Sequence, residues 1–72
     1  MKITLDKTID AAYIYLTDIP YGGVAYTYPC DPASVGEINL DFDKSGLLLG
    51  IEVHNASKKL PKKILDKAII IG

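Results

Sequence analysis

Alternation of apolar and polar residues between positions 37 and 54 is the feature that most constrains this fold. Every second residue of the first run is apolar: Ile38, Leu40 and Phe42. The period of two is typical of a half-buried strand. A turn is indicated over residues 43–46, because Asp suits the first position and Gly46 can adopt a positive φ. The second run repeats the pattern with Leu47, Leu49, Ile51 and Val53. The stretch predicts a β-hairpin with one apolar face, which the rest of the chain must extend or cover.

Three earlier segments continue the strand pattern. Residues 2–5, 11–17 and 24–28 carry apolar, β-branched or aromatic side chains at alternate positions. Residues 6–10 form a connection of hairpin length, and Pro and a Gly pair mark residues 18–23 as a loop. These segments predict three further strands.

Proline and glycine predict special positions in the sheet. Pro29 has no N–H for a ladder hydrogen bond, so the third strand should end there or lie at an edge, before a second loop over residues 29–34. Gly50 interrupts the last strand, where glycine often marks a bulge or the close approach of a backbone or a ring.

A short helix is predicted over residues 61–68. Pro61 suits a first helical turn, and Ser57 or Asn55 can cap the segment that comes after the sheet. A helix of about two turns is too short to stand alone in water and must dock. For Ile69–Ile71, continuation of the helix and an extended conformation are both open.

The pattern as a whole predicts an α+β fold in a single domain of 72 residues. We expect a small antiparallel β-sheet of four or five strands, connected as a meander, with one short C-terminal helix. In that order, one face is apolar: Ile3, Leu5, Ile14, Leu16, Ile38, Leu40, Phe42, Leu47, Leu49, Ile51 and Val53. The opposite face is mixed: Tyr13, Tyr15, Asn39, Asp41, Leu48, Glu52 and His54, with Tyr26 and Tyr28 as further candidates.

The apolar face is larger than one short helix can cover. Leaving half of it in water would lose several kcal/mol at about 25 cal/mol per Å², a large share of a small domain's stability. An internal disulfide cannot supply the missing stability, because Cys30 is the single cysteine. One Cys and one His cannot form a structural zinc site without several carboxylates. We therefore expect a homo-oligomer, with a dimer favoured, formed by packing sheet on sheet or by exchanging the C-terminal segment.

The charge distribution limits the classes of molecule that the chain can be expected to bind. The net charge is −1, and the chain has no arginine, which is the preferred reader of guanine and of paired phosphate oxygens. Residues 1–55 hold three lysines and eight acids, hence −5, whereas residues 56–72 hold five lysines and one acid, hence +4. Specific nucleic-acid binding is disfavoured. The sequence contains neither a signal-peptide pattern nor an apolar run of membrane-spanning length, so we expect a cytoplasmic protein with no membrane association.

One constellation has the residue types of an acid/base or weak metal site: Tyr13, Tyr15, Asp41, Glu52 and His54. Glu52 and His54 share a strand face at a spacing of two, and the tyrosines lie on the same predicted face. The alternative is a solvated sheet face with cross-strand tyrosine packing, which we favour because nothing in the sequence places these groups in a cleft. No cofactor is expected.

Three further patterns give weaker indications of a functional site. Residues 41–46 resemble a calcium loop but lack the helix-loop-helix setting and the final bidentate Glu. Cys30 has no partner base in the sequence, and the pair Gly22-Gly23 leads to no phosphate-binding helix. We interpret the three as a turn, a loop thiol and a turn.

Two sequence pieces resemble a known family. Asp10-Ala11-x-Tyr13-Ile14-x-Leu16 and Gly50-Ile51-Glu52-Val53-x-Asn55-Ala56-Ser57 are similar to the prokaryotic domain of unknown function 2283. The resemblance implies a small β-rich domain with a C-terminal helix and brings no established activity or catalytic residue. It also suggests an antitoxin-like partner of a small ribonuclease-like toxin.

The sequence is compatible with three functions, which we state as hypotheses. The first is a non-enzymatic protein–protein interaction module, the second is a small-ligand binder or weak enzyme on the tyrosine face, and the third is a structural self-assembling protein.

Overall fold

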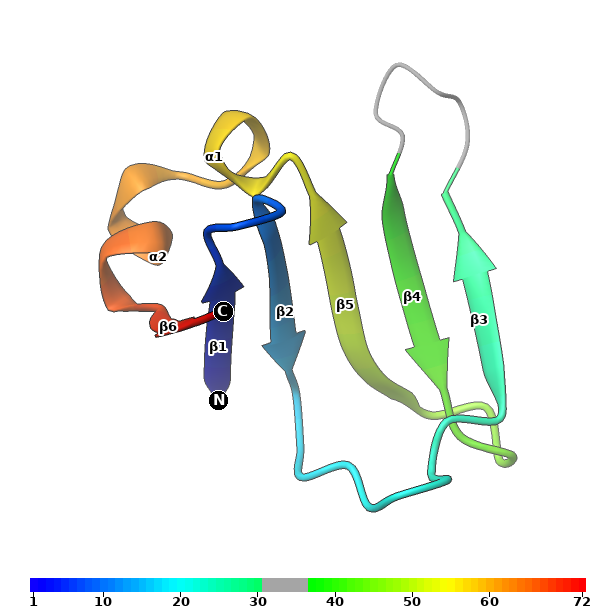
Figure 1. Cartoon of the computed structure of the whole chain (residues 1–72). Coiled ribbons are helices and arrows are strands. Elements are labelled where there is room, and N and C mark those ends of the chain that lie inside the picture. The colour runs from blue at the N-terminus through cyan, green and yellow to red at the C-terminus, as the bar shows by residue number, and fades with distance from the viewer. Residues whose placement is uncertain (31–36) are drawn as a thin grey trace.

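The computed structural model describes residues 1–30 and 37–72 and contains one six-stranded sheet (Figure 1). The strands are β1 (Lys2–Asp6), β2 (Ala11–Tyr15), β3 (Tyr26–Pro29), β4 (Ile38–Phe42), β5 (Leu48–His54) and β6 (Ile69–Ile71). Two short helices, α1 (Ala56–Lys59) and α2 (Lys62–Lys67), connect β5 to β6. The predicted α+β class and the largely antiparallel sheet are confirmed.

The strand order departs from the predicted meander. The order is β3-β4-β5-β2-β1-β6, so the connection after β2 passes to the far edge of the sheet and β5 returns to pair with β2. β5 is the longest strand, and its Ile51 and Val53 lie opposite apolar residues on both neighbours. β5 therefore lies inside the sheet, because its apolar residues match those of a neighbour on each side. Its position depends on this pairing and not on the order of the strands along the chain.

The C-terminal segment contains two helices and a strand instead of the single helix predicted for residues 61–68. Pro61 is the N-cap of α2 with φ −58°, and α2 ends at Ala68, whose ψ of 144° is extended. Ile69–Ile71 is a strand parallel to β1, which settles the question that the sequence left open. Both helices are too short to be stable in isolation and depend on docking.

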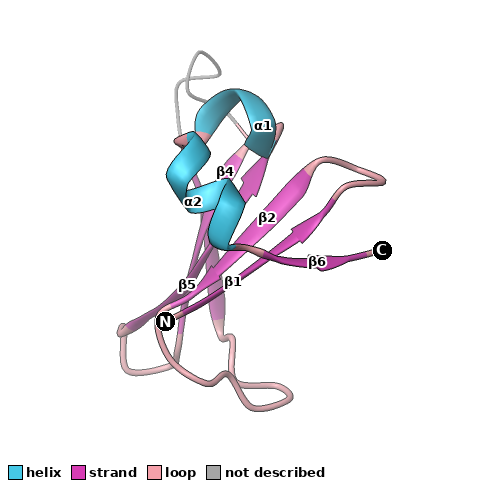
Figure 2. Cartoon of the chain, turned by 90° about the vertical axis from the view of Figure 1, so that its left-hand side faces the viewer, coloured by secondary structure: helices cyan, strands magenta, loops and turns pink. Residues whose placement is uncertain are grey.

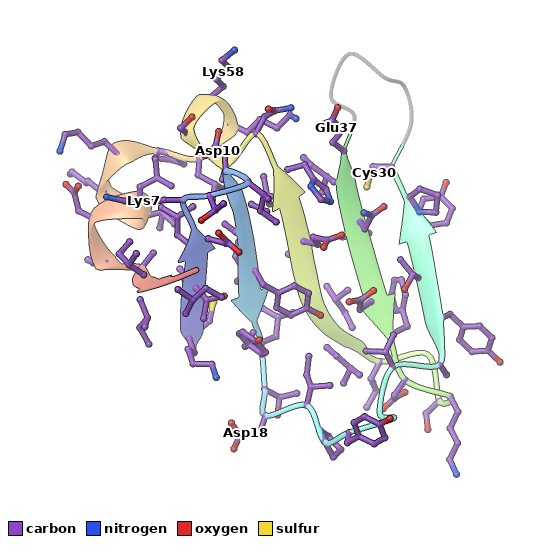
Figure 3. The ribbon with its side chains drawn as sticks, viewed as in Figure 1. Lys7, Asp10, Asp18, Cys30, Glu37 and Lys58 are labelled. Atoms are coloured by element: carbon purple, nitrogen blue, oxygen red, sulfur yellow. The ribbon has the colours of Figure 1, made fainter. Side chains whose placement is uncertain are left out.

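The first helix is capped from a distant turn. Asn55 is the N-cap residue of α1, one of the two predicted positions, but its side chain makes no capping hydrogen bond. Asp10, in the β1–β2 turn, has φ 53°, and its backbone oxygen accepts the Ala56 N–H at 2.9 Å. Its carboxylate accepts the Ser57 N–H at 3.1 Å and the Ser57 hydroxyl at 2.7 Å. Figure 3 shows Asp10 beneath α1, at the start of β2.

The core lies under the C-terminal segment. Five hydrophobic residues of the described chain are buried: Leu5, Ala12, Leu49, Val53 and Ala56. The register places Leu5, Ala12 and Val53 in one row across β1, β2 and β5. Leu60, Leu65 and Ala68 pack against this row, so both helices lie on the apolar face, as Figure 2 shows from the side.

The rest of the apolar face continues beyond the helices. Tyr28 lies opposite Leu40 and Tyr26 opposite Phe42, so both tyrosines share the apolar face and the suggestion that they join the mixed face is wrong. A register shift between Asp41 and Phe42 also pairs Leu48 with Phe42, which removes Leu48 from the mixed face. We call this set the open apolar face: Leu16, Tyr26, Tyr28, Leu40 and Phe42.

The predicted turn at residues 43–46 is confirmed. Gly46 has φ 87° and donates its N–H to the Asp43 backbone oxygen at 3.0 Å, while the Asp43 carboxylate accepts the N–H groups of Ser45 and Leu47. Of the second predicted loop, residues 31–34 lie outside the described residues. Within the described part of the chain, no helix has the length and apolar character needed to cross a membrane.

Asp10→Ala should lower the free energy of unfolding by about 1–3 kcal/mol, because two hydrogen bonds to Ser57 and the cap of α1 are lost together. Urea denaturation of the purified chain measures it. Asp18→Ala, at an exposed loop position, is the control and should change stability by less than about 0.5 kcal/mol. Equal losses in the two variants would contradict a capping role for Asp10.

Candidate functional site

The mixed face of the sheet brings the predicted site residues together. Tyr13 on β2 lies opposite Glu52 on β5, and Asp41 on β4 lies opposite Gly50. His54 is two positions after Glu52, on the same side of β5. We call this set the polar face: Tyr13, Tyr15, Asn39, Asp41, Glu52 and His54.

A hydrogen-bonded chain crosses the polar face at Asp41. The Tyr13 hydroxyl donates to Asp41 Oδ2 at 2.6 Å, and the Thr27 hydroxyl of β3 donates to Asp41 Oδ1 at 2.7 Å. Each carboxylate oxygen therefore has a partner from a different strand. The hydrogen bonds tie β2 to β4 across the intervening strand β5, and β4 to its neighbour β3.

Gly50 provides the space that Tyr13 needs to reach Asp41. A Cβ built on Gly50 would lie 2.6 Å from Tyr13 Cζ, far inside van der Waals contact. The ring thus lies directly over the glycine, between its own strand and β4. The prediction that Gly50 marks a close approach by a ring is confirmed.

A second group surrounds Glu52. Asn39 donates its side-chain N–H to Glu52 Oε1 at 2.9 Å, and His54 Nε2 lies 3.2 Å from the same oxygen. The side chains of His54 and Glu52 are 39% and 41% exposed, so water screens this pair. Asn39 contacts Glu52 across β4 and β5, whereas His54 and Glu52 are neighbours on one face of β5.

The two tyrosines pack edge to face. Their ring centroids are 4.6 Å apart with an interplanar angle of 61°, and Lys2 Nζ lies 4.2 Å from the centroid of the Tyr15 ring. Tyr13 and Tyr15 lie two positions apart on β2, so the rings pack along one strand, whereas Lys2 reaches Tyr15 from the neighbouring strand β1 as a cation–π contact.

The electrostatics make Tyr13 a hydrogen-bond donor. Its pKa is raised well above the ordinary value near 10, first by desolvation and then by the hydrogen bond to Asp41 and the negative charge of that carboxylate. A phenol with a raised pKa stays protonated at neutral pH, whereas a catalytic base must lose its proton there. Tyr13 therefore holds Asp41 in place.

The metal and cleft hypotheses find little support at this face. The described residues contain no group of three or more His, Cys, Asp or Glu placed to hold a metal ion. One concavity of about 600 Å³ lies beneath α2, between Leu5, Leu65 and Ile70, and another of about 440 Å³ lies beside Lys2 and Tyr15. Asp41, Glu52 and His54 line neither.

Sequence reasoning missed three members of the network. Thr27, Asn39 and Lys2 were not among the candidate site residues, although Asn39 was expected on the same face. Their contacts depend on cross-strand register: the pairing of β3 with β4 and of β4 with β5 brings Thr27 and Asn39 to the carboxylates, and the pairing of β1 with β2 brings Lys2 to the Tyr15 ring. The single local signal was the alternation that placed Asn39 beside Asp41.

The fold and the polar face define a small α+β domain with an open sheet, whose polar side chains bind one another. The family-model comparison matches residues 2–57 to the protein family of unknown function DUF2283. The chain belongs to the DUF2283 family, as the sequence resemblance indicated. Neither a curated protein nor a solved structure matches the chain.

Gly50→Ala should destabilise the fold by about 1–3 kcal/mol, since the new methyl group overlaps the Tyr13 ring. Urea denaturation measures the change. In a Tyr13→Ala background the same substitution should lose most of its effect, because the ring is gone. An undiminished effect there would show that the clash is with something else.

The raised pKa of Tyr13 predicts alkaline instability. The stability that the protonated Tyr13 contributes is fully present below a pH of about 10, the pKa of tyrosine in the unfolded chain. It declines as the pH rises toward the higher pKa of Tyr13 in the folded chain, because the unfolded chain releases the proton first. The stability advantage of the wild-type chain over Tyr13→Phe should therefore shrink above about pH 10. Tyrosinate absorbance should also show one of the five tyrosines ionising after the others. Ionisation of all five together would contradict this environment for Tyr13.

Proposed function

We propose that this chain is a non-enzymatic protein–protein interaction module that uses the open apolar face, and that the first occupant of this face is a second copy of the chain. The single observation that carries the proposal is the incomplete cover of the sheet. Stable domains bury each apolar sheet face against a second layer, and here the helices pack only on the row of Leu5, Ala12 and Val53.

The exposed area agrees with an incompletely covered sheet. The chain exposes 5102 Å², whereas a compact monomer of this length is expected to expose about 4,400 Å². The radius of gyration of 12.2 Å likewise exceeds the value of about 11 Å for a compact domain of this length.

The composition of the open apolar face also suits a protein partner. Tyr26 and Tyr28 are 62% and 59% exposed, and Leu16 is 41% exposed. Tyrosine is enriched at protein interfaces because it combines a large apolar ring with a polar tip. Sheet-on-sheet packing about a two-fold axis would bring these side chains against their own copies.

The small-ligand and enzyme alternatives draw less support from the polar face. Tyr13, Asp41, Asn39 and Glu52 are engaged with one another, and a substrate would have to replace those bonds. The module proposal needs no such exchange.

A different protein is the second candidate for the same face. Residues 1–55 carry a net charge of −5, which would complement a basic protein such as a small ribonuclease-like toxin. A chain that stays monomeric at high concentration with its apolar face exposed would favour this candidate over the homodimer.

Tyr26→Lys/Tyr28→Lys tests the module. The wild-type chain should associate through the open apolar face, and the double variant should weaken that contact at least tenfold, because two desolvated charges would enter an apolar interface. Light scattering coupled to gel filtration measures the mass across a concentration series. Tyr21→Lys, at a fully exposed loop position (106%), is the matched control and should leave the mass unchanged.

An unchanged mass for Tyr26→Lys/Tyr28→Lys would remove the face as the interface, provided that circular dichroism shows the folded sheet. A wild-type chain that is a monomer at all concentrations would remove the homodimer itself.

A further inference from the structure

We propose that β6 is a second association surface, at which the outer edge of the strand pairs with β6 of another copy and continues the sheet. This surface is separate from the open apolar face. It concerns the backbone of Ile69–Ile71 at one end of the sheet, whereas the tyrosines of β3 stand at the other end.

β6 has a free edge. It is the last strand in the order β3-β4-β5-β2-β1-β6 and pairs with β1 alone. Figure 2 views the sheet from this side and shows both helices to the left of β6, which they do not cover. Backbone N–H and C=O groups on the outer side of an edge strand are available to a further strand.

The two edges of the sheet differ in their protection. β3 includes Pro29, which cannot donate to an added strand and so blunts that edge. β6 consists of three isoleucines that are 54%, 51% and 48% exposed, with no proline or charged side chain among them. Proteins commonly protect a free edge strand with charged residues or proline. An uncharged, β-branched edge without proline can therefore accept a further strand.

The strand is complementary to itself. Ile69–Ile71 reads the same in both directions, so antiparallel pairing of two copies about a two-fold axis sets isoleucine against isoleucine at every position. The pairing brings together no like charges and adds contacts between β-branched side chains on both faces. This symmetry is the reason to assign the edge to a second copy.

The two surfaces act independently. Because β6 and β3 are opposite ends of one sheet, association through the β6 edge leaves the open apolar face uncovered. A chain that uses both surfaces forms an assembly larger than a dimer, which closes at four copies only if the two two-fold axes cross at right angles, and a chain that uses one surface forms a dimer.

Ile69→Lys/Ile71→Lys tests the edge. In the register with β1, Ile69 lies opposite Thr4 and Ile71 opposite Asp6, so both positions are on the polar side and Ile70, opposite the buried Leu5, is unchanged. Lysines on an edge strand are a common means of preventing strand addition. Thr8→Lys/Thr17→Lys adds the same charge at exposed positions outside the strands and is the control.

The expected masses separate this inference from the proposed function. The wild-type and control chains should form assemblies larger than a dimer, the lysine variant of β6 should form dimers, and its combination with Tyr26→Lys/Tyr28→Lys should give monomers. If the β6 variant has the same number of chains as the wild type, the edge is not an interface, whatever the result for the apolar face. If only the tyrosine variant retains the wild-type number, the proposed function fails and the edge remains.

A measurement on the wild-type chain guards against misfolding of the variant. Amide hydrogen exchange at Ile69–Ile71 should slow at least tenfold as the protein concentration rises through the association range, because outward N–H groups become hydrogen-bonded. Exchange at the same rate at every concentration would overturn the pairing.

Discussion

The packing of the C-terminal segment on the row formed by Leu5, Ala12 and Val53 is the interaction on which the rest of the structure depends. This row contains three of the five buried hydrophobic residues, and Ala56, which begins α1, is a fourth. The Asp10 turn holds α1 over the row by accepting the Ala56 and Ser57 N–H groups. If this contact is lost, the chain keeps a sheet without a second layer, which is marginal for so small a domain.

The pieces of sequence that resemble the family have structural roles on both sides of this contact. Asp10 and Ser57, 47 residues apart, join the first hairpin to the first helix. Tyr13 and Gly50 form the other pair, in which the missing side chain of the glycine admits the tyrosine ring on its way to Asp41. Both pairs stabilise the sheet, and neither requires a substrate. On the polar face, the side chains of Tyr13, Asp41, Asn39 and Glu52 thus form hydrogen bonds with one another.

The two proposed surfaces have a common origin in the partial cover of the sheet. The helices cover one end of the apolar face, and the tyrosines of β3 remain exposed at the other end. The strand β6 contributes three residues to the sheet and presents an isoleucine edge. In both places apolar groups or backbone hydrogen-bonding groups of the described residues face outward, which is the observation that the two proposals share.

Local sequence patterns were sufficient to predict the class of fold, the β4–β5 hairpin with its turn at Gly46, and the close approach at Gly50. They also predicted which residues of β1, β2, β4 and most of β5 share the apolar face. These features depend on local alternation and on single residues with restricted conformations, which a linear pattern contains. The strand order, the strand at Ile69–Ile71 and the capping of α1 by Asp10 became evident only from the folded chain. The same holds for the face of Tyr26 and Tyr28 and for the register shift that pairs Leu48 with Phe42. Each of these depends on which distant segments pair and in what register, and a period of two is compatible with several pairings until the packing of the whole chain selects one.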